Sequence, residues 1–208
     1  GKIKNLSAMH AEKFLLDGPT GKLEVVVNDP GTTRRAIALI AHPHPLYGGT
    51  LDNKVAQTLA KTFFELNCVA LRPNFRGVGA SEGKYDEGRG EVDDMLAVHA
   101  YAKKQFGDLP VYSAGFSFGG FIASQISKKT QLKQLVMIAP AVETFPLGEV
   151  AKDTIVIHGE LDETVPFKSI LDWARAQELA VITIPGADHF FHRRLHHINY
   201  FVTKLCQF

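Results

Sequence analysis

The sequence has few cysteines, almost no net charge and no long hydrophobic run. Its two cysteines, Cys68 and Cys206, lie in apolar-patterned segments and are expected to be buried thiols. This excludes a disulfide scaffold and favours the reducing cytoplasm. A formal net charge of +1 creates no field that would attract nucleic acid or an anionic membrane. Every apolar run is shorter than the ~18 residues of a membrane span, and the first residues lack the apolar centre of a signal peptide.

A length of 208 residues suits one domain with a single core. Short apolar runs alternate with segments of helical spacing, which predicts an α/β fold with a mainly parallel sheet and helices on both faces. Strands are expected at residues 14–17, 23–27, 36–41, 68–71, 111–114, 135–139, 154–158 and 181–184, and helices at 52–66, 91–106, 121–126, 166–178 and 193–205.

The first two of these strands flank a turn at residues 18–21 and are expected to form an antiparallel hairpin. We interpret residues 1–13 as an N-terminal extension, in part a cloning remnant, and residues 14–208 as a single core domain. Only residues 140–153 separate the strands at 135–139 and 154–158. That segment is too short for a lid domain, so we expect an open active-site face.

A serine turn lies at the centre of the chain, where an apolar strand passes through Gly115-Phe116-Ser117-Phe118-Gly119 into a helix. This context gives the Gly-x-Ser-x-Gly pattern its meaning. The outer positions must be small, because a Cβ there would collide with the neighbouring strand and helix. The turn lifts the hydroxyl clear of the sheet and aims the first helical amides at the space above it. Ser117 is therefore predicted to be a nucleophile, although a serine that opens a helix can also be a plain N-cap.

The base and the acid are expected in loops that follow later strands, since chemistry in such sheets gathers at the carboxyl ends of the strands. A serine needs an imidazole to take its proton, and the imidazole needs a carboxylate to fix its tautomer. His189 is the predicted base and Asp162 the predicted acid, in the chain order Ser, Asp, His. The rival acids are Glu160, Glu163 and Asp188; the last is disfavoured because adjacent residues of an extended segment point in opposite directions.

The loop at residues 42–49 follows a central strand and is expected to complete an oxyanion hole with the amide of Phe118. Its prolines cannot donate, so the second donor is the amide of His44 or of Leu46, and the sequence does not decide between them. His42 is interpreted as a buried residue that bonds to backbone near Arg76. Tyr47, Phe190 and Phe118 are expected to line an apolar acyl pocket.

Two further patterns are discounted. The glycine-rich segment 77–83 matches neither a dinucleotide fingerprint nor a phosphate-binding loop. His192, His196 and His197 fall at helical spacing, but no carboxylate or cysteine joins them, so no metal site is predicted.

The combination of motifs resembles the small, lidless bacterial α/β-hydrolases, which are usually described as predicted hydrolases or esterases. The resemblance extends from about Phe14 to the end of the chain. It is carried by His-Pro-His-Pro-Leu-Tyr-Gly-Gly at 42–49, Asp-Asn-Lys at 52–54, Asn-Phe-Arg-Gly-Val-Gly-Ala-Ser-Glu-Gly at 74–83, Gly-Phe-Ser-Phe-Gly-Gly at 115–120 and Gly-Ala-Asp-His-Phe-Phe at 186–191. It implies a Ser117–Asp162–His189 triad on an α/β-hydrolase core, with Arg76 bracing loops, but it implies no particular substrate.

The sequence thus predicts a serine hydrolase that cleaves a small-molecule carboxylic ester or thioester through an acyl-enzyme on Ser117. Two alternatives stay open: a peptidase, and a binding or scaffold protein that keeps the fold without turnover. No metal or organic cofactor is implied.

Overall fold

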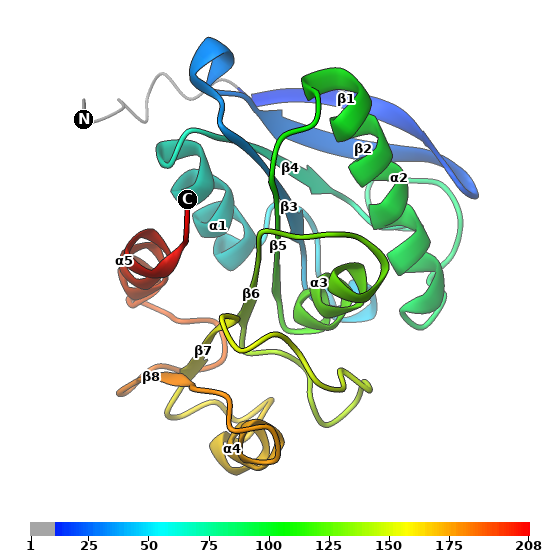
Figure 1. Ribbon diagram of the computed structural model, residues 1–208. Coiled ribbons are helices and arrows are strands. Elements are labelled where there is room, and N and C mark those ends of the chain that lie inside the picture. Colours follow the sequence, from blue (N-terminus) through cyan, green and yellow to red (C-terminus); the bar gives the residue numbers. More distant parts are fainter. Residues whose placement is uncertain (1–10) are drawn as a thin grey trace.

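A computed structural model describes residues 11–208 as an eight-stranded sheet with helices on both faces (Figure 1). The strands are β1 (Ala11–Gly18), β2 (Gly21–Asn28), β3 (Ala36–Ala41), β4 (Cys68–Pro73), β5 (Val111–Phe116), β6 (Gln134–Ile138), β7 (Ile155–Gly159) and β8 (Ile182–Ile184). The helices are α1 (Lys54–Glu65), α2 (Arg89–Phe106), α3 (Phe118–Lys129), α4 (Phe167–Arg175) and α5 (Leu195–Leu205), with short 3₁₀ helices η2 (Gly31–Thr33) and η3 (Pro45–Tyr47).

The strands lie in the order β1-β2-β4-β3-β5-β6-β7-β8. The β1–β2 hairpin pairs antiparallel with itself and with β4, and all other neighbours are parallel, which confirms the predicted mainly parallel sheet. Strand β1 begins at Ala11, so residues 11–13 of the expected extension belong to the hairpin. Residues 1–10 lie outside the described part of the chain.

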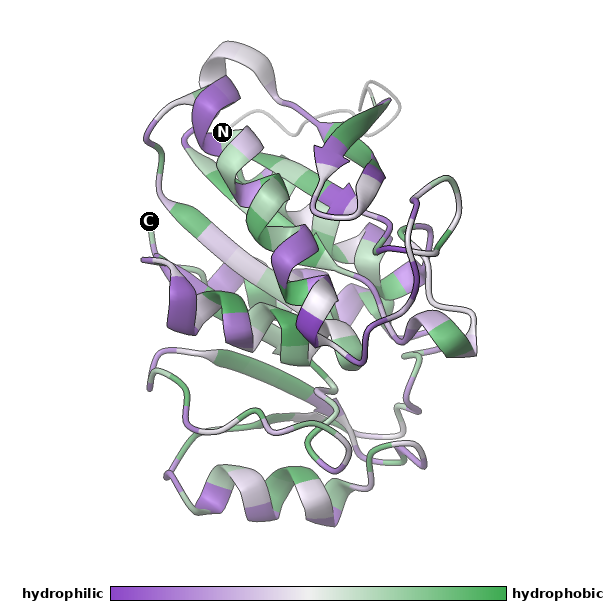
Figure 2. Cartoon of the chain, turned by 90° about the vertical axis from the view of Figure 1, so that its right-hand side faces the viewer, coloured by the Kyte–Doolittle hydropathy of each residue, from purple (hydrophilic) through white to green (hydrophobic). Residues whose placement is uncertain are grey.

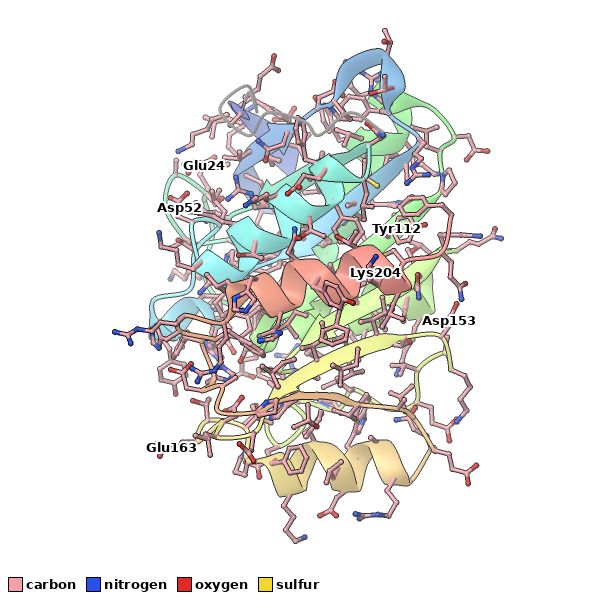
Figure 3. The ribbon with its side chains drawn as sticks, turned by 90° about the vertical axis from the view of Figure 1, so that its left-hand side faces the viewer. Glu24, Asp52, Tyr112, Asp153, Glu163 and Lys204 are labelled. Carbon is pink, nitrogen blue, oxygen red and sulfur yellow. The ribbon has the colours of Figure 1, made fainter. Side chains whose placement is uncertain are left out.

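The core follows from the pleat of the central strands, which are buried on both faces. In β3, Ile37 and Leu39 face one core, and Ala38 and Ile40 face the other. Helices α2, α3 and α4 cover the first face, and α1 and α5 cover the second. Figure 3 shows α5, which carries Lys204, lying alongside α1. Figure 2 shows mostly green central strands, whereas α4 at the bottom alternates between purple and green because only one of its sides is buried.

The two cysteines differ in exposure. Cys68 is buried, as expected, but Cys206 follows the last helix and is only half-buried. Burial raises the pKa of the Cys206 thiol to about 12, so this thiol is protonated and unreactive at neutral pH.

The carboxyl ends of β3, β4, β5, β7 and β8 gather at one end of the sheet, and their loops form a single face. Figure 3 places Asp52, after β3, and Glu163, after β7, at this end, while Asp153, before β7, lies at the opposite end. Residues 139–154 connect β6 to β7 without a helix or strand, so no lid domain is inserted within residues 11–208. None of the helices in this part of the chain combines the length and hydrophobicity that a bilayer crossing requires.

Candidate active site

Ser117 stands at the turn between β5 and α3, where its backbone has φ 58° and ψ −116°. A positive φ with this ψ lies outside the regions that a residue with a side chain favours, and it persists here because the strand and the helix fix both ends of the turn. A Cβ on Gly115 would lie 1.9 Å from the carbonyl oxygen of Gly119. A Cβ on Gly119 would lie 2.1 Å from the carbonyl oxygen of Ala41. Only glycine fits either position, which is the steric reason for the Gly-x-Ser-x-Gly pattern.

Ser117, His189 and Asp162 form a hydrogen-bonded chain across three loops. His189 Nδ1 lies 2.7 Å from Asp162 Oδ2, and His189 Nε2 lies 3.2 Å from Ser117 Oγ. All three residues are buried. The second carboxylate oxygen of Asp162 accepts the amides of Thr164 and Val165 at 2.9 and 2.7 Å. These bonds orient the carboxylate toward the imidazole.

Two of the three rival acids have other partners, and the third is exposed. Glu160 Oε1 accepts the amide of Gly186 at 2.9 Å, and the side chain of Asp188 pairs with the ring and the amide of His192. Glu163 is exposed on the loop after β7 (Figure 3). Within residues 11–208, Asp162 is the carboxylate that contacts the His189 ring.

His158 is a neighbour of the acid that sequence reasoning missed. Its Nε2 donates to the carbonyl oxygen of Val165 at 2.7 Å and lies 3.6 Å from Asp162 Oδ2. Burial lowers the pKa of His158, so the ring stays neutral beside the carboxylate. The residue lies within the buried strand β7, and its apolar setting gave no sign of a polar role.

His42 anchors the loop that follows β3. Its Nδ1 donates to the carbonyl oxygen of Pro43 at 2.6 Å, and its Nε2 accepts the amide of Phe75 at 3.1 Å. Burial lowers its pKa to about 4. The ring therefore ties this loop to the loop after β4 as a neutral group, and the prediction of a buried histidine bonded to backbone near Arg76 is confirmed.

Arg76 fixes the loop after β4 to helix α2. Its guanidinium donates to Asp94 Oδ1 at 2.9 Å and to the carbonyl oxygen of Gly90 at 2.8 Å, and its own amide donates to Asp94 Oδ2 at 3.0 Å. The ion pair is buried. These contacts confirm the expected role of Arg76 in bracing loops.

The two candidate oxyanion amides in this loop differ in their partners. The Leu46 amide donates to Nδ1 of the His44 ring at 3.1 Å. The carbonyl oxygen of His44 accepts the amides of Tyr47 and Gly49 at 3.1 and 3.0 Å. No acceptor among the described residues engages the His44 amide. The amide of Phe118, as the first residue of α3, has no intrahelical acceptor either.

A cavity of about 520 Å³ opens above the Ser117 hydroxyl. Tyr47, Phe190 and Phe118, the residues expected in an acyl pocket, all line it. Leu46 is 65% exposed and is not part of the lining. The wall also includes residues to which the sequence assigned no part in the pocket, among them Asn53, Glu143, Thr144, Phe145, Thr164 and Val165. Three of them belong to the β6–β7 loop; their place just after a strand end was the one signal that could have marked them.

The C-terminal histidines are engaged locally. His192 pairs with Asp188, and the rings of His196 and His197 lie 4.2 Å apart. In residues 11–208, no three His, Cys, Asp or Glu side chains converge to hold a metal ion.

Comparison with known proteins places the chain in a family. The family model described as serine aminopeptidase, S33, matches residues 36–151, more than half of the chain. The chain belongs to this family. A curated relative, an uncharacterized protein of Rickettsia prowazekii, is 32% identical to the S33-family chain over 194 residues, which cover 86% of the chain and 82% of the relative.

Two solved structures share the fold of this S33-family protein over nearly its whole length. An α/β serine hydrolase homologue from Coxiella burnetii is 39% identical, with a TM-score of 0.87 over 93% of this chain and 96% of that one. A serine hydrolase without a lid from Xanthomonas campestris is 30% identical, with a TM-score of 0.89 over 99% of this chain and 96% of that one. The α/β-hydrolase fold and the resemblance to lidless bacterial hydrolases are thereby confirmed.

Proposed function

We propose that the protein is a serine hydrolase that cleaves a carboxylic ester or thioester through an acyl-enzyme on Ser117. His189 takes the proton of the Ser117 hydroxyl as the oxygen attacks the carbonyl carbon, and it then returns this proton to the leaving group. Asp162 holds His189 in the tautomer with Nδ1 protonated and balances the charge of the imidazolium. Water, activated by His189, then releases the acyl group from Ser117.

The hydrogen-bonded chain from Asp162 through His189 to Ser117 carries this proposal. Its members come from loops after β5, β7 and β8, and they meet under a cavity wide enough for a substrate. A nucleophile, a base and an orienting carboxylate within hydrogen-bonding distance are the arrangement that acyl transfer requires. A scaffold protein without turnover does not require this arrangement of nucleophile, base and carboxylate.

We propose the amides of Phe118 and His44 as the oxyanion donors. Both residues line the cavity, and within residues 11–208 both amides lack a protein acceptor. The amide of Leu46 is already bound to the His44 ring, so its use would require breaking that bond. Two preorganised donors of this kind stabilise the negative charge that develops on the carbonyl oxygen in the transition state.

An ester or thioester with an apolar acyl group suits the aromatic wall formed by Tyr47, Phe118, Phe145 and Phe190. One observation favours aminopeptidase activity as a second candidate. Glu143 also lines the cavity, and within residues 11–208 its carboxylate forms no ion pair, although it accepts the hydroxyl of Ser169. An unpaired carboxylate of this kind could hold the amino group of a peptide.

Parallel assays of 4-nitrophenyl butyrate, its thioester analogue and alanine 4-nitroanilide test the proposed function. We expect hydrolysis of the ester and the thioester, and a much lower kcat/KM for the anilide. Efficient anilide hydrolysis that is lost in Glu143→Gln would replace the proposal by the aminopeptidase. If none of the three substrates is hydrolysed by folded protein, the scaffold alternative takes its place.

A further inference from the structure

We propose that Tyr85 is a positioning residue for the oxyanion hole. It would act by holding the ring of His44, which in turn engages the Leu46 amide and leaves the His44 amide as the free donor of the loop after β3. This inference rests on the proposed function, because it concerns how the second oxyanion donor is held. Tyr85 itself does not touch the substrate cavity, and sequence analysis gave it no role.

The Leu46 amide fixes the position of the proton on the His44 ring, and the Tyr85 hydroxyl receives that proton. The Leu46 amide can only donate, so the Nδ1 that receives it at 3.1 Å carries no proton. Burial lowers the pKa of His44, so the ring is neutral and its single proton is on Nε2. Nε2 lies 3.0 Å from the hydroxyl oxygen of Tyr85, which therefore accepts this proton in a hydrogen bond.

This tautomer separates the two candidate donors of the loop. With Nδ1 unprotonated, the ring holds the Leu46 amide, and the backbone amide of His44 is left without a competing acceptor in the described chain. With the proton on Nδ1, the ring would present a donor to the Leu46 amide and the two would repel. The short loop would then rearrange, and the His44 amide would move with it. The Leu46 amide selects the first arrangement, because a tyrosine hydroxyl can donate or accept and would bond Nε2 in either tautomer. Tyr85 holds the ring in this arrangement by accepting the proton of Nε2.

Tyr85 is well placed to hold the ring because its own segment is anchored. Glu91, in the first turn of α2, accepts the amides of Asp86 and Gly88 at 2.8 Å each. The Tyr85 ring lies 4.9 Å from the His44 ring and 6.1 Å from that of Phe118. The hydroxyl is therefore presented from a fixed segment of the loop after β4, on the side of His44 away from Leu46.

The substitution Tyr85→Phe removes the acceptor and keeps the aromatic ring. We expect kcat for 4-nitrophenyl butyrate to fall about fivefold, the factor for one lost neutral hydrogen bond, with KM within twofold of the wild type. Affinity for an alkylboronic acid, whose tetrahedral adduct with Ser117 places an oxygen in the oxyanion hole, should fall by the same factor. The matched control is Tyr101→Phe, which removes the hydroxyl of another half-buried tyrosine of the α2 region that packs against Phe14 and Phe106 instead.

Nitrogen-15 spectra of histidine-labelled protein give a second measurement that does not depend on turnover. The His44 signals, assigned with His44→Asn, should show the proton on Nε2 in the wild type and in both variants. The Nε2 signal should be displaced from its wild-type position in Tyr85→Phe, where its acceptor is lost, and should keep that position in Tyr101→Phe. A proton on Nδ1 in the wild type would overturn the proposal.

The kinetic results for Tyr85→Phe decide whether Tyr85 has a positioning role. A fall in kcat and in boronate affinity without a change in KM supports the positioning role. Wild-type values for Tyr85→Phe overturn it, and so does a fall in kcat matched by a lower melting temperature and a raised KM, because that pattern describes general loosening. If the wild type hydrolyses no ester, the proposed function fails, and the nitrogen-15 spectra alone decide whether Tyr85 holds the His44 ring.

Discussion

Both oxygens of the Asp162 carboxylate have hydrogen-bond partners at this site. One of its oxygens receives two loop amides and the other receives His189 Nδ1, so the group is oriented from both sides. Asp162→Asn keeps the size and can still accept the amides of Thr164 and Val165. It would then offer an amide N–H to His189 Nδ1 and thus favour the wrong tautomer.

We expect Asp162→Asn to lower kcat for ester hydrolysis by about 10³- to 10⁴-fold, with little change in KM. Glu163→Gln, one residue further along the same loop and exposed, is the matched control and should retain wild-type activity. Steady-state kinetics give kcat and KM for the two variants and the wild type. Comparable losses in both, or a loss only in Glu163→Gln, would show that the acid has been misassigned.

The burial of His42 makes the free energy of unfolding depend on pH. The unfolded chain binds a proton on His42 with a pKa of 6.5, whereas burial lowers the folded pKa to about 4. Between these values the unfolded state holds more protons, so stability falls as the pH falls. The loss from this one group is about 3 kcal/mol across the interval, at about 1.4 kcal/mol per pKa unit.

Urea unfolding at a series of pH values from 7 to 4 measures this effect. We expect His42→Gln to be less stable at pH 7 but to lose less stability on acidification than the wild type. His196→Gln, on an exposed position of α5, should keep the wild-type pH dependence. Parallel curves for wild type and His42→Gln would mean that His42 is not a buried neutral group.

Individual residues could be predicted where a local sequence pattern surrounds them. Ser117 was recognisable from its flanking glycines, and His189 and Asp162 from their places after strands. Tyr85 and His158 were not, because their contacts with His44 and Asp162 join segments that no local pattern connects. The choice between the His44 and Leu46 amides required the position of a side-chain ring, which sequence spacing does not give.

At the scale of elements, the turn between β5 and α3 depends on contact between backbones. Alanine is normally favoured over glycine within a helix by about 1 kcal/mol. At position 119 the added Cβ would lie 2.1 Å from the carbonyl oxygen of Ala41 on β3, and neither backbone can move without disturbing the sheet.

Gly119→Ala is therefore expected to lower the free energy of unfolding by more than about 3 kcal/mol, despite the better helix former. Lys129→Ala, at the exposed end of the same helix, is the control and should change it by less than about 0.5 kcal/mol. Chemical denaturation measures both variants. A Gly119→Ala protein as stable as the wild type would show that α3 is not packed this closely on β3.

Elements were predictable in kind because their apolar periodicity is strong. The strand at residues 36–41 has the predicted bounds, and the helix expected at 91–106 begins only two residues earlier, at Arg89. The ends of some strands differ from the predicted ends because pairing with a neighbouring strand extends them. Strand β1 starts at Ala11 because its first residues pair with the end of β2, and β4 continues to Pro73 because it also pairs with β2.

At the scale of the whole molecule, the alternation of strands and helices predicted a mainly parallel sheet but not the order of its strands. Strand β3 lies between β4 and β5, so the chain reverses its direction of travel across the sheet there. Such a reversal opens a crevice at the carboxyl ends of the strands. The loop of His44 and the Ser117 turn lie at the ends of these adjacent strands, β3 and β5, and His44 and Phe118 line the same cavity.

The central claim is that the folded molecule contains one activated serine. Intact-mass analysis after exposure to a fluorophosphonate tests it most directly, with wild type and Ser117→Ala compared at equal concentration and with circular dichroism confirming that both are folded. The account predicts one covalent adduct per wild-type molecule and none on Ser117→Ala. A folded wild-type protein without an adduct, or an adduct that persists in Ser117→Ala, would contradict it.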